Sequence, residues 1–193
     1  MTSTAGAGTP TKQLHKFGGS SLADASCYQR VAAIMADYSQ PGDLMVVSAA
    51  GSTTNQLISW LKLSQSDRLS AHQVQQTLRR YHSDLIAALL PAEAADRLTS
   101  LFIRDLERLA ALLDGAITEA VYAEVVGHGE IWSARLMAAV LSQRDIDATW
   151  LDARDFLRAE RAAQPQVDEG KSWPLLQALL TQHPHKRLVV TGF

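Results

Sequence analysis

The apolar residues of this chain form two kinds of pattern, short compact runs and longer stripes at helical spacing. The compact runs predict strands at Gln13–Phe17, Leu44–Ser48, Ala148–Leu151 and Leu188–Thr191. The stripes predict helices at Asp24–Tyr38, Thr53–Leu63 and Pro174–Gln182. Strands that alternate with helices along a chain are typical of a parallel α/β sheet, and the pattern favours this fold class.

The middle of the chain departs from that rhythm, because two long helical stripes follow each other without a strand between them. The first begins at a capping-box pattern, Ser70 with Gln73, and the second spans Ala92–Leu113. We therefore expect a helical hairpin inserted at about residues 68–115, with its leucines packed in the core.

The composition supports one soluble domain. The 193 residues are 47% hydrophobic and 20% charged, and the formal net charge of −2 gives no field that would gather nucleic acid or an anionic membrane. No run approaches the ~18 apolar residues of a membrane helix. We expect residues 1–12 to be a disordered lead-in and residues 13–193 to form the domain. The single cysteine, Cys27, is expected to be a buried structural thiol in a cytoplasmic protein.

The first candidate site is Lys16–Ser21, between a predicted strand and a predicted helix. Gly18 and Gly19 let the backbone pass close to a ligand, and successive N–H groups that open into a helix N-terminus favour an anion. The lysine adds a positive charge, and two hydroxyl groups follow the glycines. These features fit a phosphate-binding turn, and an ordinary strand-to-helix turn with a solvated lysine fits them equally well.

The second candidate site is Ser48–Asn55, where a predicted strand ends and a helix begins. Its hydroxyl groups, its amide and its small residues around a helix N-terminus suit a carboxylate ligand that needs no buried countercharge. Residues that only cap the helix would give the same pattern.

The third candidate site lies where a helical stretch leads into Gly127–Glu130 and continues over Ile131–Leu141. Glu130, with Ser133 nearby, follows a Gly-His-Gly segment that lets a ligand approach, so its carboxylate can hold a substrate ammonium group. The alternative is a surface glutamate in the first turn of a helix, where the helix dipole favours it.

Other chemistries do not fit the spacing of the residues. The two glycines do not form the Gly-x-Gly-x-x-Gly of a dinucleotide fold, and Lys16 precedes them instead of following them as in a P-loop. The six histidines lack the paired spacing of metal ligands, and no Ser-His-Asp arrangement can be assembled. We assign no metal site, and phosphate chemistry remains the leading interpretation.

The chain ends at Thr191–Phe193, directly after a predicted strand. A domain that stopped there would leave the exit of this strand without a helix to pack against. This position indicates a piece of a longer protein, and a native C-terminal strand is the alternative.

Together, the three sites resemble the signature of the aspartokinase family. The motifs that match are, in order, Lys16–Ser21, Val46–Asn55, Gly129-Glu130 with Ser133 and Leu136, and the strand Val190–Phe193. Their order and spacing agree with the family from about Leu14 onward. Gln73–Arg80 and Arg158–Gln166 are also similar to bifunctional members that carry a homoserine dehydrogenase.

The resemblance implies an amino-acid-kinase-like three-layer αβα sandwich. It also implies ATP-dependent phosphorylation of the β-carboxylate of L-aspartate to 4-phospho-L-aspartate, the first step toward lysine, methionine and threonine. Mg²⁺ would accompany ATP, NADP would serve only the dehydrogenase part, and the full-length parent would be a homo-oligomer with small-molecule substrates.

The resemblance further implies roles for single residues. Lys16 would be the catalytic residue at the transferred phosphate, and the phosphates of ATP would contact Lys16, Gly18, Gly19 and Ser20. Aspartate would bind through its side chain at Ser48 and Ala49, through its α-carboxylate at Thr54 and through its ammonium group at Glu130.

The chain also departs from the family's pattern. It lacks the Gly-rich loop with a serine and an aspartate that follows the last strand, the adenine-binding half, the regulatory domains and the dehydrogenase. We therefore expect the 193 residues alone to be essentially inactive. Two alternatives remain open, another amino-acid kinase that acts on glutamate, an N-acyl glutamate or a nucleotide, and a non-catalytic binding module.

Overall fold

A computed structural model describes residues 12–160 and 166–192 of the chain. Its elements are β1 (Leu14–Phe17), the 3-10 turn η1 (Gly19–Leu22), α1 (Ala25–Tyr38), β2 (Leu44–Val47), α2 (Thr53–Ser64), α3 (Arg68–Leu89), α4 (Ala92–Leu113), α5 (Glu119–Ser142), β3 (Ala148–Leu151), α6 (Ala153–Phe156), α7 (Glu169–Gln182) and β4 (Arg187–Thr191). Apart from Lys12, the lead-in expected at residues 1–12 lies outside the described residues.

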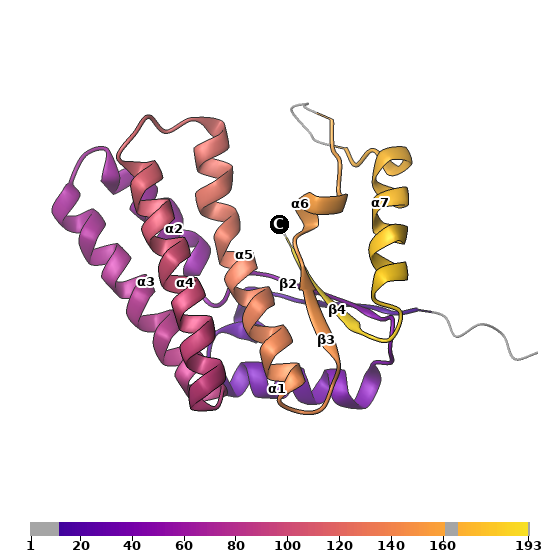
Figure 1. Cartoon of the computed structure of the whole chain (residues 1–193). Coiled ribbons are helices and arrows are strands. Elements are labelled where there is room, and N and C mark those ends of the chain that lie inside the picture. Colours follow the sequence, from indigo (N-terminus) through magenta and orange to yellow (C-terminus); the bar gives the residue numbers. More distant parts are fainter. Residues whose placement is uncertain (1–11, 161–165, 193) are drawn as a thin grey trace, which may run out of the picture.

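The four strands form one parallel sheet in the order β1-β2-β4-β3 (Figure 1). The register pairs Lys16 with Val46 and pairs Val47 with Thr191. Because the strands run in the same direction, their carboxyl ends lie at one edge, which is where open parallel sheets bind ligands. The α/β class expected from the sequence is confirmed.

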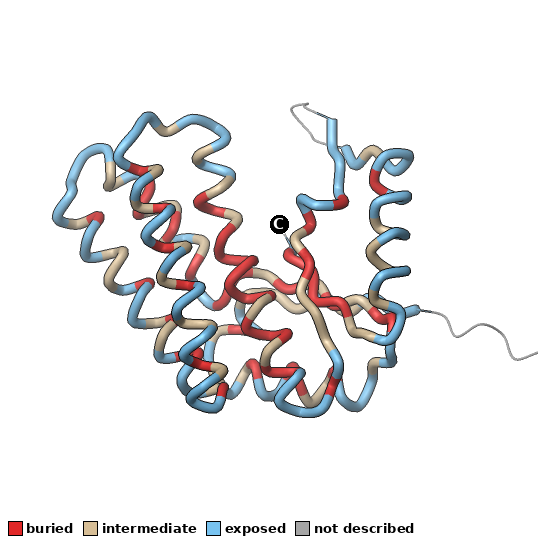
Figure 2. Tube along the Cα trace, in the orientation of Figure 1, coloured by how far each residue is buried: buried red, intermediate tan, exposed pale blue. Residues whose placement is uncertain are grey.

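Helices cover both faces of the sheet and produce three layers. α1 and α5 pack on one face, where Met45 and Val47 of β2 are buried in the main core. α7 covers the other face, where Leu176 packs against a second core cluster that includes Leu188 and Val190. The buried residues concentrate along α5 and the central strand β4 (Figure 2).

The two helices expected at residues 68–115 are α3 and α4. They pack with α2 beside α5, on the side of α5 away from β3 and β4 (Figure 1). Phe102 and Leu109 of α4 are buried in the main core, as expected for an amphipathic stripe.

The start of α3 differs from the expectation. The N-cap is Asp67, not Ser70: the Asp67 backbone is extended, and its Oδ1 accepts a hydrogen bond from the Ser70 backbone N–H at 3.1 Å. Ser70 lies in the first turn, and its hydroxyl donates to Asp67 Oδ2 at 2.6 Å. One carboxylate satisfies both donors, so the helix begins at Arg68.

Three further expectations need correction. α5 runs unbroken through Gly127 and Gly129, so Glu130 lies in its middle rather than in a first turn. α7 begins at Glu169 and contains Pro174 in its interior. Cys27 is only half-buried, because the inward-facing position of that turn is occupied by the next residue, the fully buried Tyr28.

No helix in the described part of the chain is both long and apolar enough to cross a membrane.

Candidate active site

The carboxyl edge of the sheet brings together the first and second candidate sites. Lys16 lies on β1 and Ser48 directly follows β2. The Ser48 backbone N–H donates to the carbonyl oxygen of Phe17 at 3.1 Å. This bond joins the turn of the first site (residues 16–21) to the turn of the second site (residues 48–55), which is called the second turn below. Gly192 follows β4 at the same edge, and its N–H donates to Val47 O at 2.9 Å.

The two glycines of the first site have different surroundings. A Cβ on Gly19 would lie 2.9 Å from the Ala49 carbonyl oxygen, so glycine is needed for the close approach of the two turns. A Cβ on Gly18 would meet no described atom within 4 Å. The space at the missing side chain of Gly18 is therefore open, and Lys16, two residues earlier in the chain, is exposed.

The first site does not open directly into a long helix, as the sequence had suggested. The four-residue turn η1 follows Gly18, and α1 begins only at Ala25. The Ser21 N–H already donates to Gly18 O at 3.0 Å. The charge available to an anion therefore comes mainly from Lys16 and not from a helix dipole.

The second site is a compact turn at the start of α2. Ala49 and Thr53 are buried, whereas Ser48 and Thr54 are half-buried and can reach a ligand. The Thr53 hydroxyl donates to the Ala50 carbonyl oxygen at 2.6 Å. Gly51 adopts a φ of 53°, a left-handed conformation that favours glycine.

Glu130 comes from α5 to the second site. It is 5% exposed, and its Oε1 accepts a hydrogen bond from the Ala49 backbone N–H at 3.2 Å. Its Oε2 is buried and accepts no hydrogen bond from the described residues. Burial raises the pKa of this carboxyl above its usual value. An unpaired buried carboxylate oxygen is costly, so this side chain is prepared for a cationic partner.

Gly129 makes this arrangement possible. A Cβ at this position would lie 2.7 Å from the Ala49 Cβ and 3.3 Å from Thr53 Cγ2. The absence of a side chain at Gly129 lets the second turn pack directly on α5 beside Glu130.

Ser133, also singled out from the sequence, lies elsewhere. Its hydroxyl oxygen is 2.8 Å from the hydroxyl oxygen of Tyr28, and both residues are buried. Burial raises the pKa of Tyr28, so this pair remains neutral and joins α1 to α5. The structure therefore gives Ser133 a packing role.

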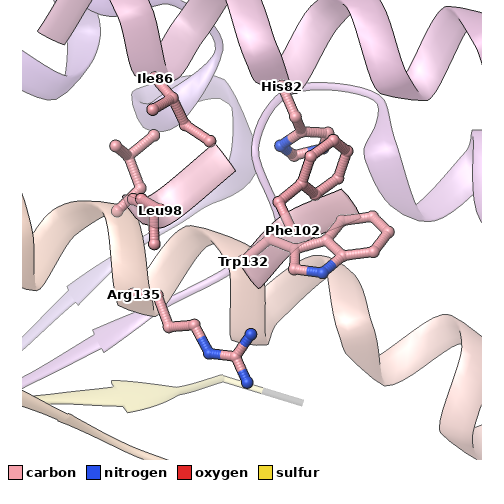
Figure 3. A pocket seen from close by; sticks show the side chains of 7 residues that line it. His82, Ile86, Leu98, Phe102, Trp132 and Arg135 are labelled. Atoms are coloured by element: carbon pink, nitrogen blue, oxygen red, sulfur yellow. The ribbon is translucent and has the colours of Figure 1, made fainter. Parts of the chain in front are cut away.

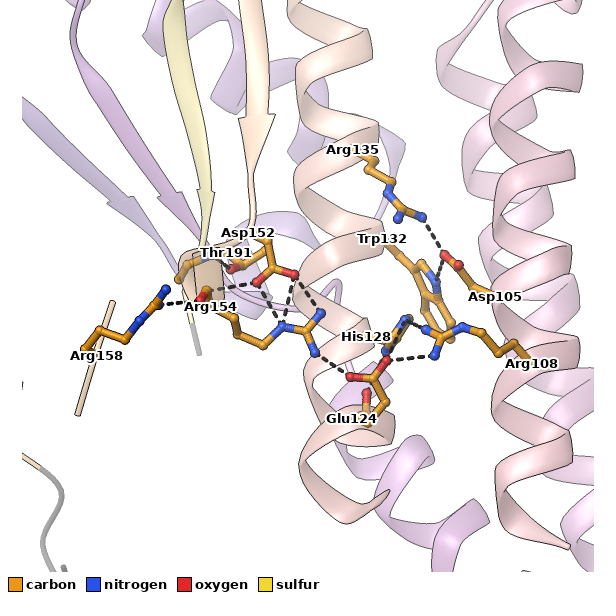
Figure 4. A network of polar contacts seen from close by, with 11 residues as sticks. Asp105, Arg108, Glu124, His128, Trp132, Arg135, Asp152, Arg154, Arg158 and Thr191 are labelled. Carbon is orange, nitrogen blue, oxygen red and sulfur yellow. Dashed lines mark hydrogen bonds and ion pairs between the residues drawn. The ribbon is translucent and has the colours of Figure 1, made fainter. Parts of the chain in front are cut away.

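A charged network at the same edge was not found from the sequence (Figure 4). Asp152, directly after β3, accepts hydrogen bonds from Arg154 Nε at 3.0 Å and Nη2 at 2.6 Å. Arg154 Nη1 also donates to Glu124 of α5, and Arg108 of α4 donates to the same carboxylate at 2.8 Å. Asp152 could have been found from the sequence, because it directly follows a predicted strand. The positions of Arg154, Glu124 and Arg108 in the sequence give no such signal.

The network holds its acidic groups ionised. Burial alone would raise the pKa of Glu124, but hydrogen bonds from Arg108 and Arg154 outweigh it and hold the pKa below its usual value. His128 is buried beside Glu124, with Nδ1 2.6 Å from the Glu124 carbonyl oxygen and Nε2 2.7 Å from Arg108. Burial lowers the pKa of His128, so it is a neutral acceptor for Arg108.

The acidic residues of the site do not form a metal centre by themselves. Among residues 12–160 and 166–192, no three His, Cys, Asp or Glu side chains lie together in a way that could hold a metal ion.

The α/β sandwich, with its candidate site at the carboxyl edge of the sheet, agrees with the comparison to known families. The chain belongs to the amino acid kinase family, whose model matches residues 11–193. It is 77% identical over its whole length to the bifunctional aspartokinase/homoserine dehydrogenase 2 of Escherichia coli K12, and it covers 24% of that protein. It is 30% identical to a chloroplastic bifunctional aspartokinase/homoserine dehydrogenase 1 of Arabidopsis thaliana, with 93% of this chain and 20% of the relative covered.

A solved structure agrees with these relatives. The structure of E. coli aspartokinase III in complex with aspartate and ADP (R-state) matches with a TM-score of 0.84 and 25% identity. The match covers 95% of this chain and 41% of the solved one. The chain thus spans between a fifth and a quarter of the length of these bifunctional relatives and less than half of the solved kinase.

Proposed function

We propose that this chain contributes the aspartate-binding half of an aspartate kinase, which transfers a phosphoryl group from Mg-ATP to the β-carboxylate of L-aspartate. The observation that carries the proposal is the buried, unpaired Oε2 of Glu130 beside the second turn. An α-ammonium group supplies the positive charge and the hydrogen-bond donors that this oxygen lacks. A substrate with a free amino group is therefore favoured over an N-acylated one.

The other residues around Glu130 fit the remaining parts of aspartate. In the proposal, Thr54 binds the α-carboxylate and Ser48 orients the reacting side chain, since both are half-buried at the mouth of the turn. The Ala49 N–H is already engaged by Glu130, so Ala49 acts by fixing this carboxylate. Donors at Lys16, Gly18, Gly19 and Ser20 face the phosphates.

The chemistry needs no general base, because the acceptor carboxylate is already a nucleophile at neutral pH. One β-carboxylate oxygen bonds to the γ-phosphorus while the bond from that phosphorus to the β-γ bridging oxygen breaks, and ADP leaves with the electron pair. Phosphoryl transfer of this kind depends mainly on positioning and on stabilisation of charge. In the proposal, the exposed Lys16, two residues before Gly18, supplies that stabilisation through its ammonium group.

The first prediction concerns Lys16. An enzyme in which this chain replaces the matching 193 residues of the E. coli relative should release ADP from Mg-ATP only when aspartate is present. Lys16→Ala should lower kcat by roughly 100-fold or more, because a charge that stabilises the transition state is removed. Lys62→Ala, at an exposed position on α2, is the control and should keep the parental kcat. Near-parental turnover in Lys16→Ala would show that Lys16 has no catalytic role.

The second prediction concerns Glu130. Glu130→Gln keeps an acceptor for the Ala49 N–H but removes the charge, so folding should survive and aspartate binding should not. Titration calorimetry should show binding weakened roughly 30-fold or more, since losing one partner of a buried charge pair costs about 2 kcal/mol or more. Glu119→Gln, exposed at the start of the same helix, should bind as the parent does. Equal affinity in Glu130→Gln and the parent would remove the basis of the proposal.

A substrate panel separates the remaining alternatives. Aspartate, glutamate and N-acetylglutamate are compared at equal concentrations with the same chimeric enzyme. Turnover with the N-acylated compound would contradict the role given to Glu130. A folded enzyme that binds neither aspartate nor ATP would instead indicate a binding module of another kind.

A further inference from the structure

Helix α3 contacts both turns of the site through Tyr81 and His82, which lie outside the stretches that suggested the function. The Tyr81 hydroxyl donates to the carbonyl oxygen of Ala23, just after η1, at 2.9 Å. A Cβ on Gly51 would lie 3.0 Å from the same hydroxyl. His82, the next residue, lies with its Nε2 3.1 Å from the hydroxyl oxygen of Thr53.

The hydrogen bonds around Thr53 define the state of His82. The Thr53 hydroxyl hydrogen goes to the Ala50 carbonyl oxygen at 2.6 Å, so this hydroxyl accepts from His82 Nε2–H. His82 is 2% exposed, and burial lowers its pKa to about 3, so the ring is neutral at physiological pH. The His82 Nε2–H group is thus the first donor in a series of two hydrogen bonds, from His82 to the Thr53 hydroxyl and from that hydroxyl to the Ala50 carbonyl oxygen.

Aromatic neighbours fix the imidazole in place. Its centroid is 5.1 Å from that of Phe102 in α4 and 5.0 Å from that of Trp132 in α5. These side chains line a narrow pocket between the three helices (Figure 3). Trp132 lies on the same helix as Glu130, so α5 carries both the proposed aspartate-binding carboxylate and one of the aromatic contacts of His82.

The second turn is therefore held from two sides. Glu130 accepts from the Ala49 N–H on one side, and His82 acts through Thr53 on Ala50 O on the other. The first contact fixes the peptide group between Ser48 and Ala49, and the second fixes the peptide group between Ala50 and Gly51. The peptide group between Ala49 and Ala50 therefore lies between two anchored neighbours. Ser48 and Thr54 lie at either end of the segment that is fixed in this way. Binding residues on a turn need such support, because small displacements reduce affinity.

We propose that His82 is a positioning residue of the aspartate-binding site, acting through the Thr53 hydroxyl on the backbone of residues 48–54. Through this contact the α3–α4 helix pair sets the geometry in which the acceptor carboxylate is presented. The inference rests on the proposed function for its kinetic test, and the local hydrogen-bond chain can also be tested on the isolated chain.

The kinetic test uses the chimeric enzyme, four variants of the hydrogen-bond chain and one control variant. His82→Leu removes the donor to Thr53 and should raise KM for aspartate about three- to tenfold, the range expected for one lost hydrogen bond. His82→Gln places an amide donor near the same position and should restore KM to within about twofold of the parent. Thr53→Val should raise KM as His82→Leu does, and the double variant should be no worse than either single one.

Leu85→Ala is the matched control, because Leu85 is buried about one turn further along α3 and its apolar side chain can form no hydrogen bond to the second turn. It should destabilise the protein through a cavity while leaving KM for aspartate unchanged. An equal rise of KM in Leu85→Ala and His82→Leu would overturn the proposal. Multiplicative effects of His82→Leu and Thr53→Val would overturn it as well.

A second measurement separates this inference from the proposed function. If the unsubstituted chimera does not turn over aspartate, the proposed function is wrong, and amide hydrogen exchange of the 193-residue chain decides the inference. His82→Leu should then speed exchange at Ala49 and Thr53 relative to amides of α5, whereas Leu85→Ala should not. Equal relative exchange in the two variants would show that His82 does not hold the turn.

Discussion

At the scale of single residues, two glycines of α5 differ in whether the surrounding structure leaves room for a side chain. A Cβ at Gly129 would lie 2.7 Å from the Ala49 Cβ, whereas a Cβ at Gly127 would meet no described atom within 4 Å. The sequence Gly-His-Gly makes the two positions look equivalent. Only the packing of the second turn on α5 distinguishes them, because Ala49 is far from both in the chain.

This difference gives the third prediction. Gly129→Ala should lower the free energy of unfolding by about 1–3 kcal/mol, because the added methyl group forces the turn away from α5. Gly127→Ala should raise it by about 0.5–1 kcal/mol, since alanine is the better residue in a helix interior. Urea unfolding followed by circular dichroism measures both. Changes of the same sign would contradict the packing described for Gly129.

At the scale of elements, the sequence predicted the strands and the long helices but misplaced some of their ends. Strand positions follow from compact apolar runs, and α4 follows from its leucine stripe, because these patterns are local. The N-cap of α3 was assigned to Ser70, whereas Asp67 occupies it. Two residues with similar capping ability three positions apart cannot be ranked without knowing where the chain leaves α2.

The fourth prediction tests this cap. Asp67→Ala should lower the melting temperature of the chain more than Ser70→Ala does, because it removes the acceptor of both the Ser70 N–H and the Ser70 hydroxyl. Differential scanning calorimetry compares the two variants directly. A larger drop in melting temperature in Ser70→Ala would indicate that Ser70, and not Asp67, is the N-cap of α3.

At the scale of the whole molecule, buried neutral histidines link folding to pH. Burial lowers the pKa of His82 to about 3, and burial also lowers the pKa of His128. An unfolded histidine has a pKa of about 6.5, so between about pH 3 and 6.5 the unfolded chain binds more protons than the folded one. The stability contributed by these neutral rings is present above about pH 6.5 and is lost as the pH falls.

The fifth prediction follows from this loss of stability as the pH falls. Between pH 6.5 and 5, the free energy of unfolding should fall with a slope that includes up to about 1.4 kcal/mol per pH unit from His82. His82→Gln should remove this contribution, whereas Leu85→Ala should lower the whole curve without changing its slope. Urea titrations at several pH values measure the slopes. An unchanged slope in His82→Gln would show that His82 is not a buried neutral group.

The α/β class, the strand end that carries Lys16 and the turn that begins at Ser48 could all be predicted from the sequence, because these features depend on residues close together in the chain. The sequence also pointed to Glu130, but it placed this residue in a first helical turn and could not show what it meets. Tertiary structure alone decided that Glu130 meets Ala49, 81 positions away, and that Thr53 meets His82, 29 positions away. Such contacts depend on how α3 and α5 pack against the second turn, and local spacing does not contain that information.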